Sequence, residues 1–352
     1  MEVEDGLIRA VGPAPASPPE RIIAPGFIDL QVNGHQEIDV ARAITEADWE
    51  RLDHLLVAQG VVAWCPTLVS APLDAYATPL ERIARAAARG GSRPAVLGAH
   101  LEGPFLGRRP GAHDTRYLLP IDLDWLGALP PIVRLVTLGP ELEGASQAVA
   151  MLHRRGTVIS LGHSDAELEE ASAAVDAGAS LVTHLFNAMG AFQHRRPGLV
   201  GLALTDPRLT PTIICDGVHV HPLAVLSAFS ARAGRSGGPG NPGIALVTDA
   251  VAWRSGAVGG LGLVRDGTDA PRRPDGTIAG SALTMDRAVA NAVEFGIDPA
   301  SALAAASRVP AEVMGLADRG RLSPGARADL VVLSPDLEPL ATWIGGREVW
   351  TA

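Results

Sequence analysis

Residues 181–189 read Leu-Val-Thr-His-Leu-Phe-Asn-Ala-Met, a short apolar run that ends in a histidine and an amide. The same order, an apolar run followed by a polar residue beside a glycine or another small residue, recurs at Glu102, His163, Asp216 and Asp249. In a barrel of parallel strands, functional groups gather at the carboxyl ends of the strands. We therefore expect these segments to contribute to one site at one end of a barrel.

Eight apolar segments are candidates for strands, and most are followed by a helical pattern. Near-continuous apolar strands suit a parallel sheet that is covered on both faces. No G-x-G-x-x-G follows the first segment, which argues against a doubly wound open sheet. We predict an α/β fold with a (β/α)8 TIM-like barrel. The eight segments are Phe27–Val32, Val61–Leu68, Ala95–Leu101, Ile132–Leu138, Val158–Leu161, Leu181–Leu185, Thr212–Cys215 and Ile244–Thr248.

The helical patterns between these segments carry recognisable ends. Thr45 with Asp48 resembles a capping box, and Gly60 ends that helix. The stretch Arg235–Gly243 is rich in Gly and Pro and is predicted to be a surface loop. The other predicted helices are Arg82–Arg89, Leu142–Arg155, 165–178, one that opens at His221-Pro222, Met285–Phe295 and Pro299–Met314.

The two ends of the chain carry strand-like runs that are too short to form a core alone. A Gly345-Gly346 pair between two such runs predicts a hairpin turn. We expect residues 1–25 and 321–352 to form one small β-sandwich domain, and residues 26–320 to form the barrel. The runs are Leu7–Val11, Ile22–Ala24, Asp329–Leu333, Ala341–Ile344 and Arg347–Trp350.

The composition is that of a globular protein, with 352 residues, 47% hydrophobic and 19% charged. A net charge of -10 argues against nucleic acid as a partner. No apolar run approaches the ~18 residues of a membrane span, and the acidic start lacks a signal-peptide core. Cys65 and Cys215 lie in apolar runs, which favours buried, reduced thiols. We predict a cytoplasmic protein with no membrane partner.

One carboxylate and two imidazoles stand at the ends of separate predicted strands, at Glu102, His163 and His184. Such a set can converge on a divalent metal and leave a position open for water. A lone histidine at a strand end is more often only a hydrogen-bonded polar residue. Three such groups at equivalent places, together with Asp249 on the last strand, favour the metal site. The alternative for Asp249 is a buried helix-capping aspartate.

Seven short motifs occur in an order that resembles the N-acetylglucosamine-6-phosphate deacetylases of the amidohydrolase superfamily. Each motif alone is modest, but the ordered set is specific, and the resemblance runs from about Pro25 to the C-terminus. The motifs are Glu102-Gly103-Pro104-Phe105, Gly111-Ala112-His113, Gly162-His163-Ser164, His184-Leu185-Phe186-Asn187-Ala188-Met189, Asp216-Gly217-Val218-His219, Thr248-Asp249-Ala250 and Ala279-Gly280-Ser281.

The resemblance implies a role for each matching residue. Glu102, His163 and His184 would hold the catalytic metal, and Asp249 would act as general base and then as general acid. His113 would contact the sugar and help to polarise the acetamide carbonyl. The implied substrate-binding residues are Ala112, His113, Asn187, Ala188, Arg195, His219, Ile278, Ala279 and Gly280, with Arg195 and His219 near the phosphate.

The implied reaction is metal-dependent hydrolysis of the acetamide of N-acetylglucosamine 6-phosphate to glucosamine 6-phosphate and acetate. Many relatives carry His-x-His at the end of strand 1 and bind two metals, whereas here that place reads Gln31-Val32-Asn33. Neutral amides are poor ligands for such ions. We therefore expect one divalent ion per subunit, zinc first, with iron, manganese or cobalt as alternatives. The resemblance also implies a homodimer. The family usually has a further strand before the run that corresponds to Leu7–Val11, and by that comparison the start of this sequence looks short.

Two other functions remain open from the sequence. One is a deacetylase of N-acetylgalactosamine 6-phosphate or of another N-acylated amine. The other is a non-catalytic sugar-phosphate-binding barrel, which loss of the metal ligands or of Asp249 would favour. Neither loss is found in the sequence.

Overall fold

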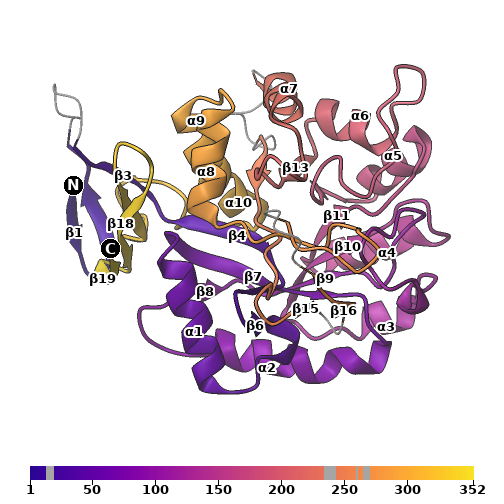
Figure 1. Cartoon of the computed structure of the whole chain (residues 1–352), viewed down its shortest axis with the longest axis horizontal. Coiled ribbons are helices and arrows are strands. Elements are labelled where there is room, and N and C mark those ends of the chain that lie inside the picture. Colours follow the sequence, from indigo (N-terminus) through magenta and orange to yellow (C-terminus); the bar gives the residue numbers. More distant parts are fainter. Residues whose placement is uncertain (13–19, 234–242, 259–260, 265–269) are drawn as a thin grey trace.

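The computed structural model describes the chain except for residues 13–19, 234–242, 259–260 and 265–269. Most of the predicted loop Arg235–Gly243 therefore lies outside the described residues. The described part contains a barrel at its centre, flanked at one side by sheets from both ends of the chain (Figure 1).

Eight parallel strands form the barrel, and each pairs with the next along the path. A bridge between Val32 and Ala250, with a hydrogen bond from Asp249 N to Gln31 O of 3.0 Å, connects the last strand to the first. The predicted (β/α)8 barrel is confirmed. Its strands are β4 (Phe27–Val32), β7 (Val61–Val69), β9 (Ala99–Glu102), β10 (Val133–Leu138), β11 (Val158–Leu161), β12 (Leu181–Val182), β13 (Thr210–Ile213) and β14 (Ala245–Leu246).

Helices surround the strands (Figure 1). The predicted capping box opens the first, because Thr45 Oγ1 accepts from Asp48 N while the Asp48 carboxylate accepts from Thr45 N. The helices are α1 (Glu46–Val57), α2 (Ala77–Ala87), α3 (Leu123–Gly127), α4 (Ala145–Arg154), α5 (Leu168–Asp176), α6 (Gly198–Thr205), α7 (Pro222–Arg232), α8 (Met285–Glu294), α9 (Pro299–Ala306) and α10 (Arg308–Val313), with 3-10 turns at Val40–Arg42, Leu73–Tyr76 and Thr115–Tyr117.

Several predicted elements need correction, and three of them have a visible physical reason or a large change in length. The third strand divides into β8 (Ala95–Val96) and β9 around Gly98, whose φ of 142° interrupts extended backbone. The predicted helix Pro299–Met314 divides into α9 and α10 at Ser307, because the Pro310 ring clashes with the preceding turn of a continuous helix. The strand at 181–185 stops at Val182.

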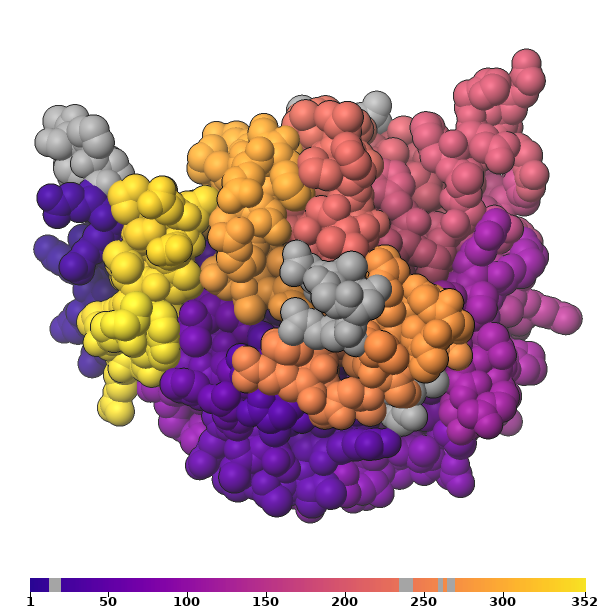
Figure 2. All heavy atoms as spheres, in the orientation of Figure 1, coloured from indigo at the N-terminus to yellow at the C-terminus, as the bar shows by residue number. Residues whose placement is uncertain are grey.

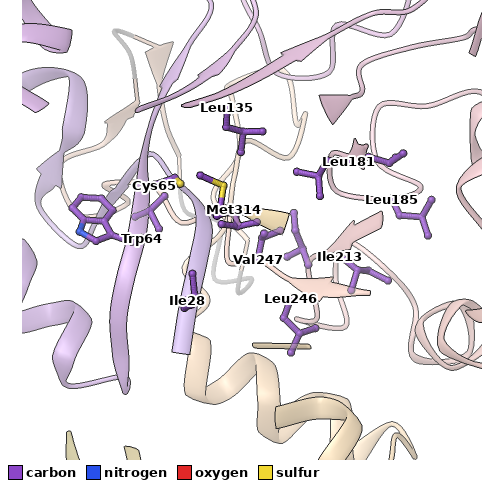
Figure 3. Packing of buried hydrophobic residues seen from close by; sticks show 14 of the residues in the cluster. Ile28, Trp64, Cys65, Leu135, Leu181, Leu185, Ile213, Leu246, Val247 and Met314 are labelled. Carbon is purple, nitrogen blue, oxygen red and sulfur yellow. The ribbon is translucent and has the colours of Figure 1, made fainter. Parts of the chain in front are cut away.

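The barrel core is built from apolar side chains of all eight strands. Every residue of β4 is buried, and so are all but the last of β7, as expected for strands covered on both faces. Figure 3 shows Trp64 and Cys65 of β7, Ile28 of β4 and Leu246 of β14 among the side chains of one cluster. This continuous core fixes the strand ends that carry the polar residues.

Both ends of the chain form antiparallel sheets beside the barrel (Figure 1). Gly345 and Gly346 have φ of 58° and 74°, so the predicted Gly-Gly hairpin turn is present between two strands. Thr342 Oγ1 donates to Val57 O of α1 at 2.7 Å, which ties the terminal sheet to the barrel. The division into two domains remains a prediction. The strands are β3 (Ile22–Pro25), β17 (Leu330–Leu333), β18 (Pro339–Ile344) and β19 (Arg347–Thr351), with a separate pair β1 (Glu2–Glu4) and β2 (Leu7–Ala10).

The described parts of the segment between β14 and α8 lie over the barrel. Figure 2 shows them in orange, spread over the face of the molecule turned to the viewer. They contain the short pair β15 (Ala257–Val258) and β16 (Leu261–Gly262), and Arg272 bridges to Val264 and to Ile278. A second short pair, β5 (Gly34–His35) and β6 (Ile38–Asp39), follows β4.

Candidate active site

A cavity of about 340 Å³ opens where the barrel strands end. Its wall includes every predicted site residue except Arg195, which is exposed and does not line it. The predicted residues in the wall are Glu102, Ala112, His113, His163, His184, Asn187, Ala188, His219, Asp249, Ile278, Ala279 and Gly280.

Three of the strand-end residues adopt left-handed backbone, with φ of 50° at His163, 33° at His184 and 49° at Asp249. This conformation is uncommon outside glycine, and it persists only where the surrounding structure holds it. It turns the chain out of the strand at the functional residue. The turn at His184 is the reason that β12 ends before the predicted Leu185.

The Glu102 carboxylate lies at the centre of a buried histidine cluster. Its Oε1 is 3.1 Å from Nε2 of His163 and 3.1 Å from Nε2 of His184, and the two Nε2 atoms are 3.0 Å apart. Burial raises the pKa of Glu102, but the hydrogen bonds of His113, His163 and His184 outweigh it and hold that pKa well below its usual range. The three atoms therefore converge on one point from three strands.

The environment of His163 leaves a lone pair on its Nε2 atom. Burial lowers its pKa to about 4, so the ring is neutral near pH 7. Its Nδ1 lies 3.2 Å from the carbonyl oxygens of Arg109 and Pro110, which places the ring proton on Nδ1. Metal-binding histidines are commonly oriented in this way by a carbonyl on the far nitrogen. The buried Glu/His/His set fits a divalent metal ion.

His113 stands on the other side of Glu102, with its Nε2 3.6 Å from Oε2. Glu102, His113 and His163 also offer ligand atoms within 4.8 Å of one another, so proximity alone would admit His113 as a ligand. However, Ser70 N donates to His113 Nδ1 at 3.3 Å, and the Ser70 hydroxyl lies 2.9 Å from the same atom and can donate to it as well. With Nδ1 as the acceptor, the ring proton is on Nε2. A protonated Nε2 is a donor, and we therefore favour His184 as the third metal ligand.

Asp249 faces this cluster from the end of β14. Burial first, and the nearby Glu102 carboxylate second, raise its pKa to about 7. Its Oδ1 accepts from Asn33 Nδ2 at 2.7 Å and from Gln31 Nε2 at 3.1 Å. No hydrogen bond to its Oδ2 is found among the described residues, and that oxygen is suited to accept a proton.

Gln31 and Asn33 were not predicted to act in the site, although the sequence showed amides at an unusual place. Gln31 Nε2 also donates to Glu102 Oε1 at 2.9 Å, so one amide links the metal cluster to Asp249. Asn33 Oδ1 is buried and has no partner in the part of the chain that the structure describes. The NH2 group of Asn33, in contrast, donates to Asp249 Oδ1 and is the part of the side chain that contacts the site.

The turn after His184 is braced by its own side chain. Asn187 Nδ2 donates to the carbonyl oxygens of His184 and Leu185 at 3.2 and 3.3 Å. Beyond it, Arg196 pairs with Glu167, whereas Arg195 is exposed and is not part of the cavity wall. The structure thus brings the predicted metal and sugar residues together, and leaves Arg195 outside.

A buried Glu/His/His cluster opposite an aspartate on the last strand of a (β/α)8 barrel defines a metal-dependent hydrolase centre. The model of the Amidohydrolase family matches residues 22–349, and the chain belongs to this family. The resemblance read from the sequence motifs is confirmed.

Relatives cover nearly the whole chain. N-acetylglucosamine-6-phosphate deacetylase of Rattus norvegicus is 40% identical over 94% of this chain and 84% of its own. N-acetylgalactosamine-6-phosphate deacetylase of Escherichia coli O157:H7 is 36% identical over 99% and 93%. Among solved structures, N-acetylglucosamine-6-phosphate deacetylase of Thermotoga maritima aligns with a TM-score of 0.90 at 30% identity, covering 100% of this chain and 94% of that one. A mutant of the Mycobacterium smegmatis deacetylase in complex with N-acetyl-D-glucosamine-6-phosphate aligns with a TM-score of 0.87 at 32% identity, covering 99% and 94%.

Proposed function

We propose that this protein hydrolyses the acetamide of N-acetylglucosamine 6-phosphate to glucosamine 6-phosphate and acetate. The observation that carries the proposal is the convergence of Glu102, His163 and His184 opposite Asp249 in one cavity. Relatives that carry the name of this activity cover most of the chain, and one of them has been solved with this phosphosugar.

Glu102, His163 and His184 would hold one divalent metal ion, with zinc proposed first. When bound, such an ion polarises the acetamide carbonyl and lowers the pKa of a water molecule from 15.7 to about 7. Gln31 and Asn33 direct NH2 groups at Glu102 and Asp249, and an amide nitrogen is not a ligand for a second ion. This arrangement supports one ion per chain.

Asp249 is the proposed general base and acid. Its free Oδ2 takes the proton of the attacking water while Asn33 and Gln31 hold Oδ1. The same oxygen then delivers the proton to the leaving amine, without which the tetrahedral intermediate would return to the amide. His113 Nε2–H, fixed through Ser70, is placed to donate to the carbonyl oxygen of the substrate.

The sugar is proposed to lie against Asn187, Ala188 and the 278–280 segment, all in the cavity wall. Its phosphate would reach His219, with Arg195 supplied by the neighbouring subunit of a homodimer. Guanidinium suits bidentate phosphate contact, and the exposed position of Arg195 leaves it available to a second copy.

The galactosamine epimer is the second candidate, because the relative from Escherichia coli O157:H7 covers 99% of this chain. Acetate release from both epimers separates the two proposals. We expect a higher kcat/KM for N-acetylglucosamine 6-phosphate, and a preference for the other epimer would reassign the substrate. If the metal-loaded protein released no acetate from either, the non-catalytic alternative would replace both.

The cytoplasm is the proposed location. Cys65 and Cys215 are both buried and unpaired, as expected in a reducing compartment. No helix in the described part of the chain has the length and apolar character needed to cross a bilayer.

A further inference from the structure

A second buried acid–histidine pair closes the turn after β13. Asp216 Oδ1 accepts from the backbone N–H groups of Val218 and His219 at 2.9 and 2.8 Å. Its Oδ2 lies 2.6 Å from His219 Nδ1. The side chains of His219 and Asp216 are only 6% and 7% exposed, so bulk water weakens this contact little.

The pair presents one ring atom to the cavity. His219 lines the cavity wall, and because Asp216 occupies Nδ1, Nε2 is the nitrogen left to meet a ligand. The other three imidazoles in the wall turn their Nε2 atoms to Glu102. In the described wall, His219 therefore offers the one imidazole that is not directed at the metal cluster.

The surroundings of His219 contain charges of both signs. Glu102, His184, Asp249 and Arg272 share the cavity wall with it.

Neutral groups lie beside the turn. Asn291 Nδ2 donates to Cys215 O at 2.8 Å, and burial raises the pKa of the Cys215 thiol to about 12. Phe295 would lie 3.3 Å from a Cβ placed on Gly217. Asp216 is therefore the negative group in direct contact with His219.

We propose that Asp216 is a positioning residue that holds His219 as a cationic donor for the phosphate of the substrate. Nδ1–H donates to Asp216, and Nε2–H donates to a phosphate oxygen. A ring that donates from Nδ1 to Asp216 and from Nε2 to a phosphate oxygen is the imidazolium, in which both nitrogens are donors. The inference rests on the proposed function, because that function supplies the phosphate.

The competing explanation is that Asp216 only braces the turn through Oδ1. Asp216→Asn separates the two explanations, because its carbonyl oxygen can still accept both backbone N–H groups. Its NH2 group would replace Oδ2 and donate to His219 Nδ1, which must then be an acceptor. The ring would become neutral and keep its proton on Nε2, so only the charge of the donor is lost.

The test measures steady-state acetate release by metal-loaded wild type and Asp216→Asn, with N-acetylglucosamine 6-phosphate and with unphosphorylated N-acetylglucosamine. Hydrogen bonds with a charged partner are roughly twice as strong as neutral ones, so we expect KM for the phosphosugar to rise about 10-fold. The kcat for the phosphosugar and kcat/KM for the unphosphorylated sugar should change less than about twofold, because the metal cluster is untouched. His219→Gln should raise the same KM, and adding Asp216→Asn to it should have no further effect.

An unchanged KM, or an equal loss with both sugars, would overturn the inference. The affinities of wild type and Asp216→Asn for glucosamine 6-phosphate and for glucosamine can also be measured by calorimetry. This measurement tests the same contribution of the phosphate without turnover. An inactive wild type would refute the proposed function, and the binding comparison would still decide the role of Asp216. Wild-type activity together with an unaffected Asp216→Asn would refute this inference alone.

Discussion

Asn33→Ala removes the shorter of the two hydrogen bonds to the Asp249 carboxylate. Asn33 Nδ2 lies 2.7 Å from Oδ1, and Gln31 Nε2 would remain at 3.1 Å. The Asn33 backbone N–H donates to Ala250 O, and Val40 N–H donates to the Asn33 carbonyl. Neither of these hydrogen bonds involves the side chain. The substitution therefore changes the carboxylate environment and preserves the turn.

The magnitude follows from the charge on the acceptor. A hydrogen bond to a charged group contributes about 1.5–3 kcal/mol, and one pKa unit corresponds to 1.36 kcal/mol. Losing a donor that favours the ionised form should raise the pKa of Asp249 by roughly 1–2 units. Burial and Glu102 already raise that pKa to about 7. A general base acts when ionised, and Asp249 is about half ionised at pH 7 in the wild type, so kcat near pH 7 should fall roughly 5- to 50-fold.

The assay is kcat against pH from about 5.5 to 9.5, with metal content measured on the same samples. Asn33→Ala should keep its metal and recover most of its kcat above its raised pKa. Gln31→Ala provides the comparison, because it removes the longer bond to Asp249 but also a contact with Glu102. A variant profile that superimposes on wild type, or a loss that is the same at every pH, would refute this role of Asn33.

Three further predictions concern single side chains. Asp249→Asn should leave folding and metal content intact and lower kcat by roughly 100- to 10,000-fold, and near-normal turnover would exclude it as the base. Burial raises the pKa of Asp29 from 3.8 to about 7, so between these pH values the folded state keeps a proton that the unfolded state has released. The free energy of unfolding should therefore decrease as pH rises from about 4 to about 7. In denaturant unfolding at pH 8, Asp29→Asn should be more stable than wild type by at most about 4 kcal/mol. If the stability of both proteins depended on pH in the same way, this prediction would be wrong. Arg195→Ala should raise KM for the phosphosugar, whereas Arg196→Ala, the matched control, should not; equal effects would remove the phosphate role of Arg195.

Much of the fold could be predicted because its strands are apolar on both faces. Phe27–Val32 and Val158–Leu161 were predicted with the bounds that the structure has. The prediction failed where local backbone overrides the apolar pattern. At His184 the left-handed turn ends a strand that was predicted to continue to Leu185, because side-chain type alone does not determine φ.

The sequence could predict those site residues whose positions depend only on the end of their own strand. Glu102, His163 and His184 meet because the barrel brings successive strand ends together. The contacts of Gln31 and Asn33 with Asp249 could not be predicted, because they join the first strand to the last across more than 200 residues. The sequence showed that these amides were unusual, but only their geometry assigns them a partner.

The most direct test of the central claim is a metal titration of the metal-free protein, followed by acetate release from N-acetylglucosamine 6-phosphate. Glu102, His163 and His184 form one ligand set, while Gln31 and Asn33 donate hydrogen bonds at the place where a second ion would need acceptors. Activity should rise linearly and reach its plateau at one equivalent of zinc per chain. Full activity without metal, or a plateau reached only at two equivalents, would contradict the account.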